Sequence, residues 1–514
     1  MRGRNLSKSR FQKGLQCEKA LWLAVHSPEV GCEPDEARQS IFDQGTEVGL
    51  IARGLFPGGS EVSEDYRHGA AALRTTARLR AEGAPVLYEP AFEYGGVFVR
   101  VDILVSADNG DWDLYEVKSS TSLKPEHISD AAVQAYVLTG AGVAIDTVNV
   151  VTMNSSYVFA GGPYDLERLF RINDVTDLVR AWTVSVPGRL QRFQEMLDGD
   201  EPDIRIGSQC HNPYTCEFNE HCRRFLPAVH PVTELPGLSE AALHRFLDRG
   251  ITSLLDVPDD YRPLSALQRE TLQSVKTGEP VVDVAGLRAD LAPLEWPVLH
   301  LDFETVSPAL PLWPGTRPYE AIPFQYSIHV HEPGGPTDHH EHIHAGTGDP
   351  RRALAERLLA DLDGGGSIVH YTSYEDRILA GLEAALPDLA PAISAVRDRL
   401  FDLYPVIRYR TKHPAAHGSA SVKQVLPAWC PQMSYAHMAI ADGQTAAARY
   451  LRTLKSLVDE ESVRVITADL IRYCALDTLA TVCLLEEMLK LAGTDQSPDS
   501  EPSSAPAAPT GSAS

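Results

Sequence analysis

Two sets of carboxylates, one in each half of the chain, have a spacing that could hold divalent cations. The residues concerned are Asp102, Glu116 and Lys118 in the first half, and Asp302, Glu304, Glu375, Tyr473 and Asp477 in the second half. A cation held by several carboxylates can neutralise the charge of a phosphodiester and activate a water molecule for its hydrolysis. The residue types therefore predict phosphoryl chemistry at two places in the chain.

The first set is expected on a group of neighbouring strands. The predicted elements of this half are helices over 6–25, 36–54, 125–138 and 164–200, and strands over 86–92, 97–105, 112–118 and 147–153. Because side chains alternate along a strand, Glu116 and Lys118 project from one face, and Asp102 lies on the adjacent strand. Lys118 could orient the attacking water or stabilise the charge of the transition state. A hairpin that carries these three residues on a solvated face is also common without any chemistry.

Four cysteines have a layout that is typical of a metal or cluster site. They are Cys17 near the N-terminus, and Cys210, Cys216 and Cys222 in a loop-rich segment. Four thiolates suit a [4Fe-4S] cluster or a structural zinc ion, for which His211 or His221 could also be ligands. Inert buried thiols are the third alternative.

An acid, a later acid-x-lysine pair and this cysteine layout together resemble the RecB/Cas4-like branch of the PD-(D/E)xK nucleases. The resemblance covers about residues 1–230. It implies a restriction-endonuclease-like domain in which Asp102 and Glu116 hold a divalent metal ion and Lys118 is catalytic. It also implies that the four cysteines hold a [4Fe-4S] cluster that joins the two ends of the domain.

The same resemblance extends to three residues on the flanking helices. In this branch an upstream acid supplements the metal ligands, which points to Glu47 in the helix predicted over 36–54. A Gln and a Tyr on the helix after the motif line the site in such nucleases. The corresponding positions here are Gln134 and Tyr136.

The second set is expected on a strand and two helices of the other half. The predicted elements are strands over 297–304, 324–331 and 367–371, and helices over 351–363, 374–385 and 464–492. This alternation of strands and helices is typical of α/β folds. Alternation along the first strand places His300, Asp302 and Glu304 on one face. Tyr473 and Asp477 are four residues apart and therefore share one face of the last helix.

The order of these motifs resembles the DEDD exonucleases of the RNase H-like fold, in their Tyr-containing subtype. The three motifs are Asp302-x-Glu304, Tyr374-Glu375 and Tyr473-x3-Asp477. The resemblance implies that the four acids of these motifs ligate two Mg²⁺ or Mn²⁺ ions and that Tyr473 orients water. The family usually has Asp where Glu375 stands, so the adjacent Asp376 is the alternative ligand. Over about residues 6–490, the chain also resembles bacterial proteins that join a RecB/Cas4-like half to a DUF2779-type half.

A basic stretch lies between the second and third of these motifs. Residues 405–441 contain no Asp or Glu, and their cationic residues include Arg408, Arg410, Lys412 and Lys423. In an acidic protein, this pattern predicts a local surface that binds the phosphates of a nucleic acid. A solvated basic loop without a ligand is the alternative.

Composition limits the classes of function. The chain has 514 residues and a net charge of -24, which argues against a protein that coats nucleic acid through bulk charge. No apolar run approaches the length of a membrane span, so no membrane partner is expected. The basic N-terminus lacks the apolar core of a signal peptide, which predicts a cytoplasmic location. In that compartment the eight cysteines are expected to be ligands or buried thiols rather than disulfides.

The predicted fold class is therefore α/β, with three domains and a tail. These are a PD-(D/E)xK domain with an iron–sulfur cluster over 1–230, a small helical linker of helix-hairpin-helix type over 231–290, an RNase H-like domain over 291–492, and a disordered tail over 493–514. The favoured function is a Mg²⁺- or Mn²⁺-dependent exonuclease with two active sites. It would act on DNA or single-stranded nucleic acid in repair or defence. The alternative is an iron–sulfur-stabilised nucleic-acid-binding subunit of a larger complex, with one or both sites inactive.

Overall fold

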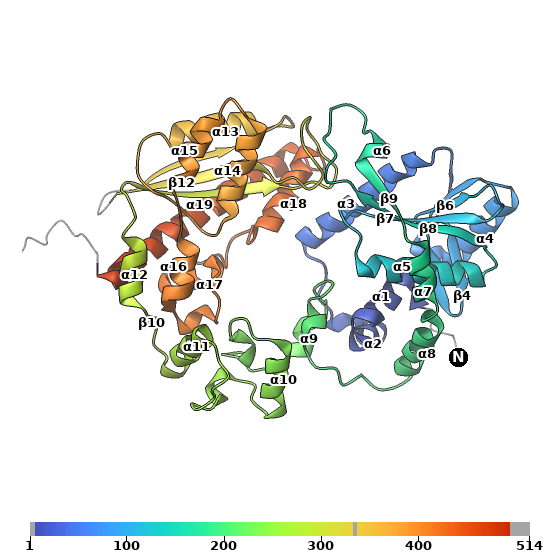
Figure 1. Cartoon of the computed structure of the whole chain (residues 1–514), viewed down its shortest axis with the longest axis horizontal. Helices are drawn as coiled ribbons and strands as arrows, with labels where there is room; N and C mark the ends of the chain where they lie inside the picture. The colour runs from blue at the N-terminus through green and yellow to red at the C-terminus, as the bar shows by residue number, and fades with distance from the viewer. Residues whose placement is uncertain (1–5, 333–336, 494–514) are drawn as a thin grey trace, which may run out of the picture.

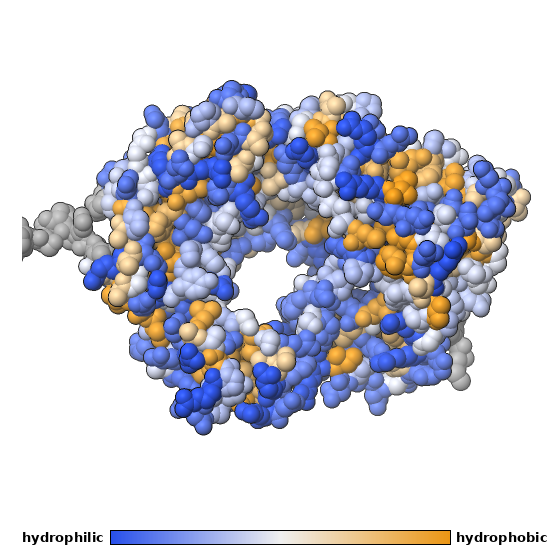
Figure 2. Space-filling view, in the orientation of Figure 1, coloured by the Kyte–Doolittle hydropathy of each residue, from blue (hydrophilic) through white to orange (hydrophobic). Residues whose placement is uncertain are grey.

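The computed structural model describes residues 6–332 and 337–493, so the predicted tail lies outside the described residues except for Gly493. The α/β organisation is confirmed, with sheets and helices in both halves. The N-terminal half, the helical linker and the C-terminal half follow one another around a ring (Figure 1). Figure 2 shows an opening through the middle of this ring. None of the helices in the described ranges is both long and apolar enough to cross a lipid bilayer.

The N-terminal half is built on a six-stranded mixed sheet. In spatial order its strands are β2 (Ser60–Glu61), β3 (Val86–Tyr88), β6 (Ile103–Ser106), β7 (Trp112–Lys118), β8 (Ile145–Met153) and β9 (Phe170–Asp174). The central strand β7 forms an antiparallel hairpin with β6 and runs parallel to β8. A parallel pair needs a crossover connection, and the apolar helix α5 (Pro125–Gly140) provides it.

Two predicted strands of this half are each divided between two sheets. Glu89 has a positive φ of 54°, and Pro90 lacks a backbone N–H, so the strand predicted over 86–92 breaks there. Its second part is β4 (Ala91–Tyr94), which pairs with β5 (Val97–Arg100) in a small separate sheet. The strand predicted over 97–105 also breaks, at Asp102, between β5 and β6.

Two predicted helices of this half are interrupted as well. The helix predicted over 6–25 is two helices, α1 (Lys8–Gln16) and α2 (Glu18–His26), because Cys17 between them is extended. The single helix predicted over 164–200 was wrong. The chain there forms α6 (Leu166–Leu169), then β9, then α7 (Thr176–Thr183) and α8 (Val186–Leu197). The free edge of β8 hydrogen-bonds with residues 170–174, and this pairing outweighs their local preference.

The linker is helical, as predicted, and packs on the cysteine-rich segment. The predicted range, 231–290, contains α10 (Glu240–Asp248), α11 (Ala266–Thr277) and most of α12 (Val284–Leu291), and the short α9 (Asn219–Arg223) precedes them. Leu287 and Leu291 of α12 belong to the core of the C-terminal half. Leu243, Phe246 and Leu254 of the linker share one buried cluster with Ile206 and Cys210. On its other side, Phe218 of the cysteine-rich segment packs with Ala20 and Leu23 of α2, so the segment contacts both the N-terminal helices and the linker.

The C-terminal half contains a five-stranded sheet between two layers of helices. Its strands, in spatial order, are β13 (Asp338–Ile343), β12 (Ile322–His331), β11 (Val298–Val306), β14 (Ile368–His370) and β15 (Leu400–Asp402). The pairs β13–β12 and β12–β11 are antiparallel, whereas β11–β14 and β14–β15 are parallel. The predicted strands and the long last helix, α19 (Glu460–Ala492), are confirmed.

The central strand β11 divides its side chains between the two helical layers. Leu299, Leu301 and Phe303 pack against one layer, which contains α13 (Arg351–Asp361), α14 (Tyr374–Ala385) and α15 (Ala390–Arg397). The alternate residues face the other layer, where His300 Nδ1 lies 3.0 Å from the Thr481 hydroxyl of α19. Asp302 and Glu304 lie on this second face, as the alternation predicted.

The ring closes where the two halves meet. Helix α3 (Glu36–Ala52) of the N-terminal half packs beside α18 (Gly443–Leu454) of the C-terminal half. Gln44 accepts a hydrogen bond of 2.9 Å from the Ala309 N–H, and Arg449 forms an ion pair of 2.8 Å with Glu36. Val48, Phe159 and Leu310 share one buried cluster across this contact. The opening in Figure 2 is thus enclosed by one continuous chain that contacts itself on both sides.

Two adjacent glycines provide a test of how β14 is held beside β11. Gly366 has a φ of +86°, and a Cβ there would lie 1.8 Å from the Pro297 carbonyl oxygen. Backbone strain at such a φ usually costs about 1–3 kcal/mol. Gly366→Ala should destabilise the protein by more than this, because the Cβ would also clash with the Pro297 carbonyl oxygen. Gly365 is exposed, and a Cβ there would meet no atom within 4 Å, so Gly365→Ala should change the stability by less than about 0.5 kcal/mol. Urea unfolding followed by circular dichroism measures both, and equal effects would contradict this account.

Candidate active sites

The first carboxylate set gathers at the centre of the N-terminal sheet. Glu116 Oε1 and Lys118 Nζ, both on β7, lie 2.6 Å apart, so the predicted shared face is confirmed. Asp102, at the break between β5 and β6, accepts a hydrogen bond of 2.6 Å from the Val117 N–H. The three residues of the motif are therefore in one place.

Two residues that the sequence did not assign complete this site. Lys8 of α1 places its Nζ 2.8 Å from Glu116 Oε1. Asp130 of α5 places its Oδ2 2.5 Å from Lys118 Nζ and 3.7 Å from Lys8 Nζ. Asp130 precedes Gln134 by one helical turn, so both lie on one face of α5, and this spacing could have predicted Asp130 as a site residue. Lys8 is 108 residues from Glu116 and left no local signal.

The structure separates the three residues that the resemblance added. Gln134 is buried and donates a hydrogen bond of 2.7 Å to Glu116 Oε2, so it joins the site. Tyr136 packs instead on Tyr94, with 5.4 Å between ring centroids. Glu47 forms an ion pair with Lys455 of the C-terminal half.

The charges of this site nearly balance. Burial, and then the neighbouring Glu116, raise the pKa of Asp102 to about 7. Burial acts in the same sense on Glu116, but Lys118 and Lys8 outweigh it and hold the pKa of Glu116 well below its ordinary value. Three carboxylates thus face two ammonium groups. A divalent ion at Asp102 and Glu116 would have to displace Lys8 or Lys118 from Glu116 Oε1.

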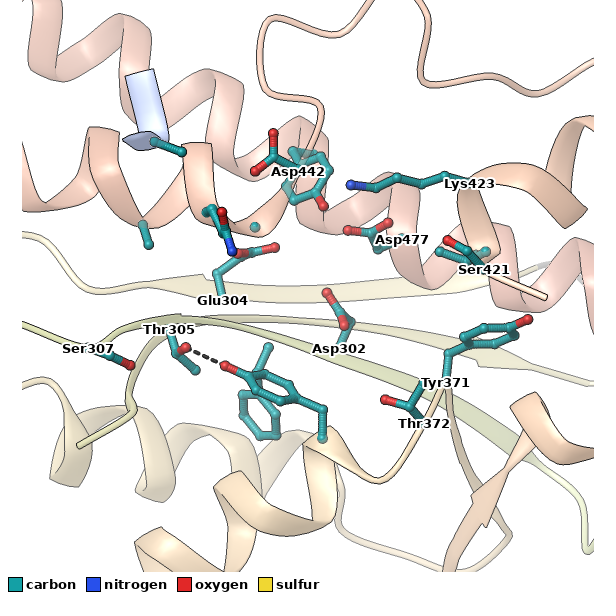
Figure 3. Close-up of a pocket in the computed structure, with 18 of the residues that line it drawn as sticks. Asp302, Glu304, Thr305, Ser307, Tyr371, Thr372, Ser421, Lys423, Asp442 and Asp477 are labelled. Carbon is teal, nitrogen blue, oxygen red and sulfur yellow. Dashed lines mark hydrogen bonds between the residues drawn. The ribbon is translucent and has the colours of Figure 1, made fainter. Parts of the chain in front are cut away.

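The second set converges from three elements of the C-terminal half. Figure 3 shows Asp302 and Glu304 of β11 beside Asp477 of α19. Glu375, at the start of α14, is buried, its charge contributes to the raised pKa of Asp302, and its carboxylate lies 3.2 Å from His370 Nδ1. The sequence left Asp376 open as the alternative to Glu375.

Asp376 points elsewhere. It forms an ion pair of 2.7 Å with Arg397 on α15. Of the two adjacent acids, Glu375 is therefore the one that the fold brings to the other carboxylates. This placement follows from the helix geometry, since consecutive residues of a helix point about 100° apart.

The second set carries much more uncompensated negative charge than the first. Burial, and then Asp477, raise the pKa values of Asp302 and Glu304 well above their ordinary values. Burial also raises the pKa of Glu375, and it raises that of Asp477 to about 6. Crowded carboxylates of this kind are the oxygen donors that Mg²⁺ and Mn²⁺ prefer.

A buried thiol lies among these acids. The ligand atoms of Asp302, Glu304 and Cys474 lie within 4.8 Å of one another. Cys474 Sγ is 3.7 Å from Asp302 Oδ2. The apolar sequence context of Cys474 predicts only a packing role, so the sequence did not indicate its contact with Asp302.

Two tyrosines lie over Asp477. Tyr473 lies one turn before Asp477 on α19, and both residues line the same cavity, as the predicted helix face requires. Tyr435, which the sequence did not single out, donates a hydrogen bond of 2.6 Å to Asp477 Oδ1. Burial, and then the charge of Asp477, raise the pKa of both phenols, so both stay protonated donors.

The second site opens into a cavity of about 1410 Å³. Residues from all three parts of the ring line it. These include Ser40, Ile41 and Gln44 of α3, Pro236 and Gly237 of the linker, and Asp302, Glu304, Tyr473 and Asp477 of the C-terminal half. A ligand that fills this cavity would therefore also contact the N-terminal half.

The basic stretch is divided between two environments. Arg408 and Lys423 line the cavity, and Figure 3 shows Lys423 extending toward Asp477 and Asp442. Arg410 instead forms ion pairs with Asp283 and Asp290, at 2.9 and 2.7 Å. The remaining cation, Lys412, pairs with Glu270 of the linker at 3.4 Å.

The fold brings the four cysteines of the predicted cluster together around one small cavity. Cys17, Cys210, Cys216 and Cys222 all line it, and all are free thiols. Cys17 lies at the start of α2, where burial raises the pKa of its thiol and the N–H groups of Lys19 and Ala20 oppose that rise. Among these four described residues, no three sulfur atoms lie within 4.8 Å of one another.

Comparisons with known proteins identify part of the C-terminal half. Residues 299–421 match the model of a family described as "Domain of unknown function (DUF2779)", so the expected DUF2779-type region is confirmed there. The match begins on β11 and ends before α19. A comparison with curated proteins finds no match. One solved structure, titled "Crystal structure of SSO0001", is 13% identical over 44% of this chain and 89% of that chain, with a TM-score of 0.22, too low to argue from.

The crowding of the second site predicts an unusual dependence of stability on pH. Its carboxyls bind protons more tightly in the folded state than in the unfolded chain, because their folded pKa values are raised. Without metal, these groups should therefore remove stability as the pH rises from about 4, where unfolded carboxyls titrate, through and beyond about 6, where Asp477 titrates. At pH 8, in a chelator, Asp302→Asn should raise the melting temperature by about 2–4 °C per kcal/mol of relieved repulsion.

The same variant separates repulsion from metal binding. Adding Mn²⁺ should raise the melting temperature of the wild type, and Asp302→Asn should lose most of that rise. Asp376→Asn is the matched control, since it removes a carboxylate one residue from Glu375 that pairs with Arg397 instead. A full Mn²⁺ effect in Asp302→Asn, or a lower melting temperature in chelator, would contradict the proposed crowding.

Proposed function

We propose that this protein is a divalent-metal-dependent nuclease with two candidate active sites, which hydrolyses DNA or single-stranded nucleic acid as an exonuclease in repair or defence. The observation that carries the proposal is the second site. Four carboxylates from three elements converge there, with Lys423 and His370 as nearby groups that can carry positive charge, and three of the four line a large cavity. Such an arrangement is costly unless metal ions are bound.

The sheet of the C-terminal half supports an RNase H-like, DEDD-type domain. Three antiparallel strands followed by two parallel ones, with acids on the central strand and on a long last helix, are what that assignment expects. Mg²⁺ or Mn²⁺ at Asp302, Glu304, Glu375 and Asp477 would neutralise phosphate charge and lower the pKa of a bound water. Tyr473 and Tyr435 would hold Asp477 in position, and Tyr473 could also orient the attacking water.

The cavity wall suits a nucleic acid strand. The phosphates of the strand could contact Arg408, Lys423 and the hydroxyl of Ser421, which all line the cavity. Its bases could stack on Tyr371 and Tyr404, whose rings lie at 5.6 Å and 81° in the same wall.

The N-terminal half supports a PD-(D/E)xK assignment less directly. Asp102, Glu116 and Lys118 have the placement that this chemistry needs, and Gln134 fixes the Glu116 carboxylate. Lys118 could stabilise the charge of the transition state once it is free of Asp130. A second function, a nucleic-acid-binding subunit of a larger repair or defence complex with a silent first site, is favoured by one observation: Lys8 and Lys118 already neutralise Glu116.

We also propose that the four cysteines hold a [4Fe-4S] cluster. They line one cavity between the N-terminal helices and the linker. A structural zinc ion draws its four ligands to within about 3.8 Å of one another, which is closer than any three of these described sulfur atoms lie. A cubane is larger and holds its thiolates further apart. Zinc is the alternative.

The two-site proposal is tested with single strands labelled at either end. In Mn²⁺, the wild type should release label, and a chelator should abolish the release. Asp302→Asn should lower the activity of the second site by at least about a hundredfold, because a metal ligand is lost. Lys118→Ala should remove a separable activity, and Asp376→Asn should change neither. No metal-dependent loss of label would favour the binding subunit, whereas loss of all activity in either folded variant would contradict two independent sites.

The cluster proposal predicts a colour. Protein purified without oxygen should be brown, with iron and sulfide near four per chain. Cys216→Ser should bleach it and lower the stability of the N-terminal half, because the cluster would connect Cys17 with residues almost two hundred positions away. Cys32→Ser is the matched control, since Cys32 is exposed and outside the cavity. Colourless protein with stoichiometric zinc would contradict the iron–sulfur cluster.

A further inference from the structure

A cluster of two histidines and one glutamate joins the linker to the C-terminal half. His230 and Glu234 lie where the N-terminal half meets the linker, and His417 lies in the loop before α17 (Val422–Trp429). His230 Nδ1 lies 3.0 Å from Glu234 Oε2, and His417 Nδ1 lies 2.9 Å from Glu234 Oε1. One ligand atom from each of the three residues lies within 4.8 Å of the others. Neither carboxylate set nor the cysteine cluster includes these residues.

The backbone holds all three side chains in place from both sides of the contact. His230 and His417 have positive φ values of 50° and 53°, a conformation that is uncommon for residues other than glycine. The His230 carbonyl accepts hydrogen bonds from the Leu254 N–H and the Ser253 hydroxyl, at 2.8 and 3.2 Å. Non-glycine residues keep such strained conformations where the surrounding structure requires them, often at ligand sites.

The next residue of the loop shows how closely the two chain segments approach. Gly418 has a φ of +70°, and a Cβ there would lie 1.7 Å from the Glu234 carbonyl oxygen. The backbone of the loop therefore rests on the backbone of the linker at Glu234. This contact fixes His417 beside Glu234 whether or not an ion is present.

The donor set selects a class of metal ion. Two imidazoles and one carboxylate are a common ligand set for Zn²⁺, with a fourth position left for water or substrate. In this structure the imidazoles are hydrogen-bonded to Glu234, with N···O separations of 3.0 and 2.9 Å. Ligand atoms on tetrahedral Zn²⁺ lie about 3.3 Å apart, so an ion could replace these hydrogen bonds with small side-chain movements. Imidazole nitrogens disfavour Mg²⁺ and Ca²⁺, which prefer oxygen ligands. The ion would therefore be different from those expected at the carboxylate sites.

We infer that His230, Glu234 and His417 bind one Zn²⁺-class transition metal ion, which ties the linker to the C-terminal half. Its position gives it a structural consequence. Pro236 and Gly237, just after Glu234, line the cavity of the second site, as do Gly418 and Lys423 just after His417. The ion would hold both edges of that cavity in register. The inference stands on these residues alone and does not depend on nuclease activity.

Zinc binding to the intact protein tests this directly. In excess Mg²⁺, to occupy oxygen-rich sites, equilibrium dialysis should find one more Zn²⁺ per chain in the wild type than in His417→Asn. Asparagine tolerates the positive φ at 417, so the backbone is kept while the imidazole is removed. His437→Asn is the matched control, because His437 is an exposed histidine of the same half. Its zinc count should equal that of the wild type.

A second variant and a second measurement separate metal binding from packing. Glu234→Gln retains hydrogen-bonding atoms for both imidazoles but removes the charge, and it should lower the Zn²⁺ affinity at least about tenfold. Added Zn²⁺ should raise the melting temperatures of the wild type and of His437→Asn by several degrees more than those of His417→Asn and Glu234→Gln. Equal zinc counts in the wild type and both site variants would overturn the inference, as would an unchanged Zn²⁺ effect on their melting temperatures.

Discussion

The C-terminal half must hold several carboxylates close together between β11 and α19, although their charges repel. This is the constraint that the rest of this half has to satisfy. Like charges are buried close together only where another favourable interaction offsets their repulsion. The opposite face of β11 supplies part of this favourable interaction, because Leu299, Leu301 and Phe303 pack in an apolar layer. The strand can therefore hold Asp302 and Glu304 against α19 even while their charges repel. The energy stored in this way is what a divalent cation would release on binding.

The two candidate sites solve the problem of buried charge differently. At the first site, Lys8 and Lys118 are the counter-ions, and the pKa of Glu116 falls. At the second site, Lys423 and His370 are the nearby groups that can carry positive charge, and the carboxyl pKa values rise instead. The charges of the first site are thus largely compensated without a metal ion, whereas a metal ion at the second site would relieve more repulsion. This difference makes the second site the stronger candidate for two-metal chemistry.

Helix α3 couples these two sites within the ring. It packs on β7, which carries Glu116, and its residues Ser40 and Gln44 line the cavity of the second site. The Tyr319 hydroxyl, also in that cavity, donates to the carbonyl of Ser119, next to Lys118. The N-terminal half is therefore part of the wall of the C-terminal site. A strand of nucleic acid in this cavity would contact both halves at once.

Local sequence patterns determined the elements that carry the site residues. Alternation placed Glu116 and Lys118 on one face of β7 and Asp302 and Glu304 on one face of β11, and the four-residue spacing placed Tyr473 above Asp477. These relations hold within one strand or one helix, where backbone geometry alone decides which side chains are neighbours. The cysteine layout was also informative, because the four thiols do line one cavity.

Tertiary structure decided everything that joins distant segments. Lys8 and Tyr435 come to the two sites from segments that are distant along the chain. Glu47 and Arg410 form ion pairs with other residues, away from the predicted sites. Strand β9 forms because the edge of β8 was free for pairing. The His230, Glu234 and His417 cluster left no motif, since its members come from two loops 183 residues apart. Spacing along the chain describes one element at a time, whereas burial and ion pairing depend on which elements pack together. Only the packed chain settles those contacts.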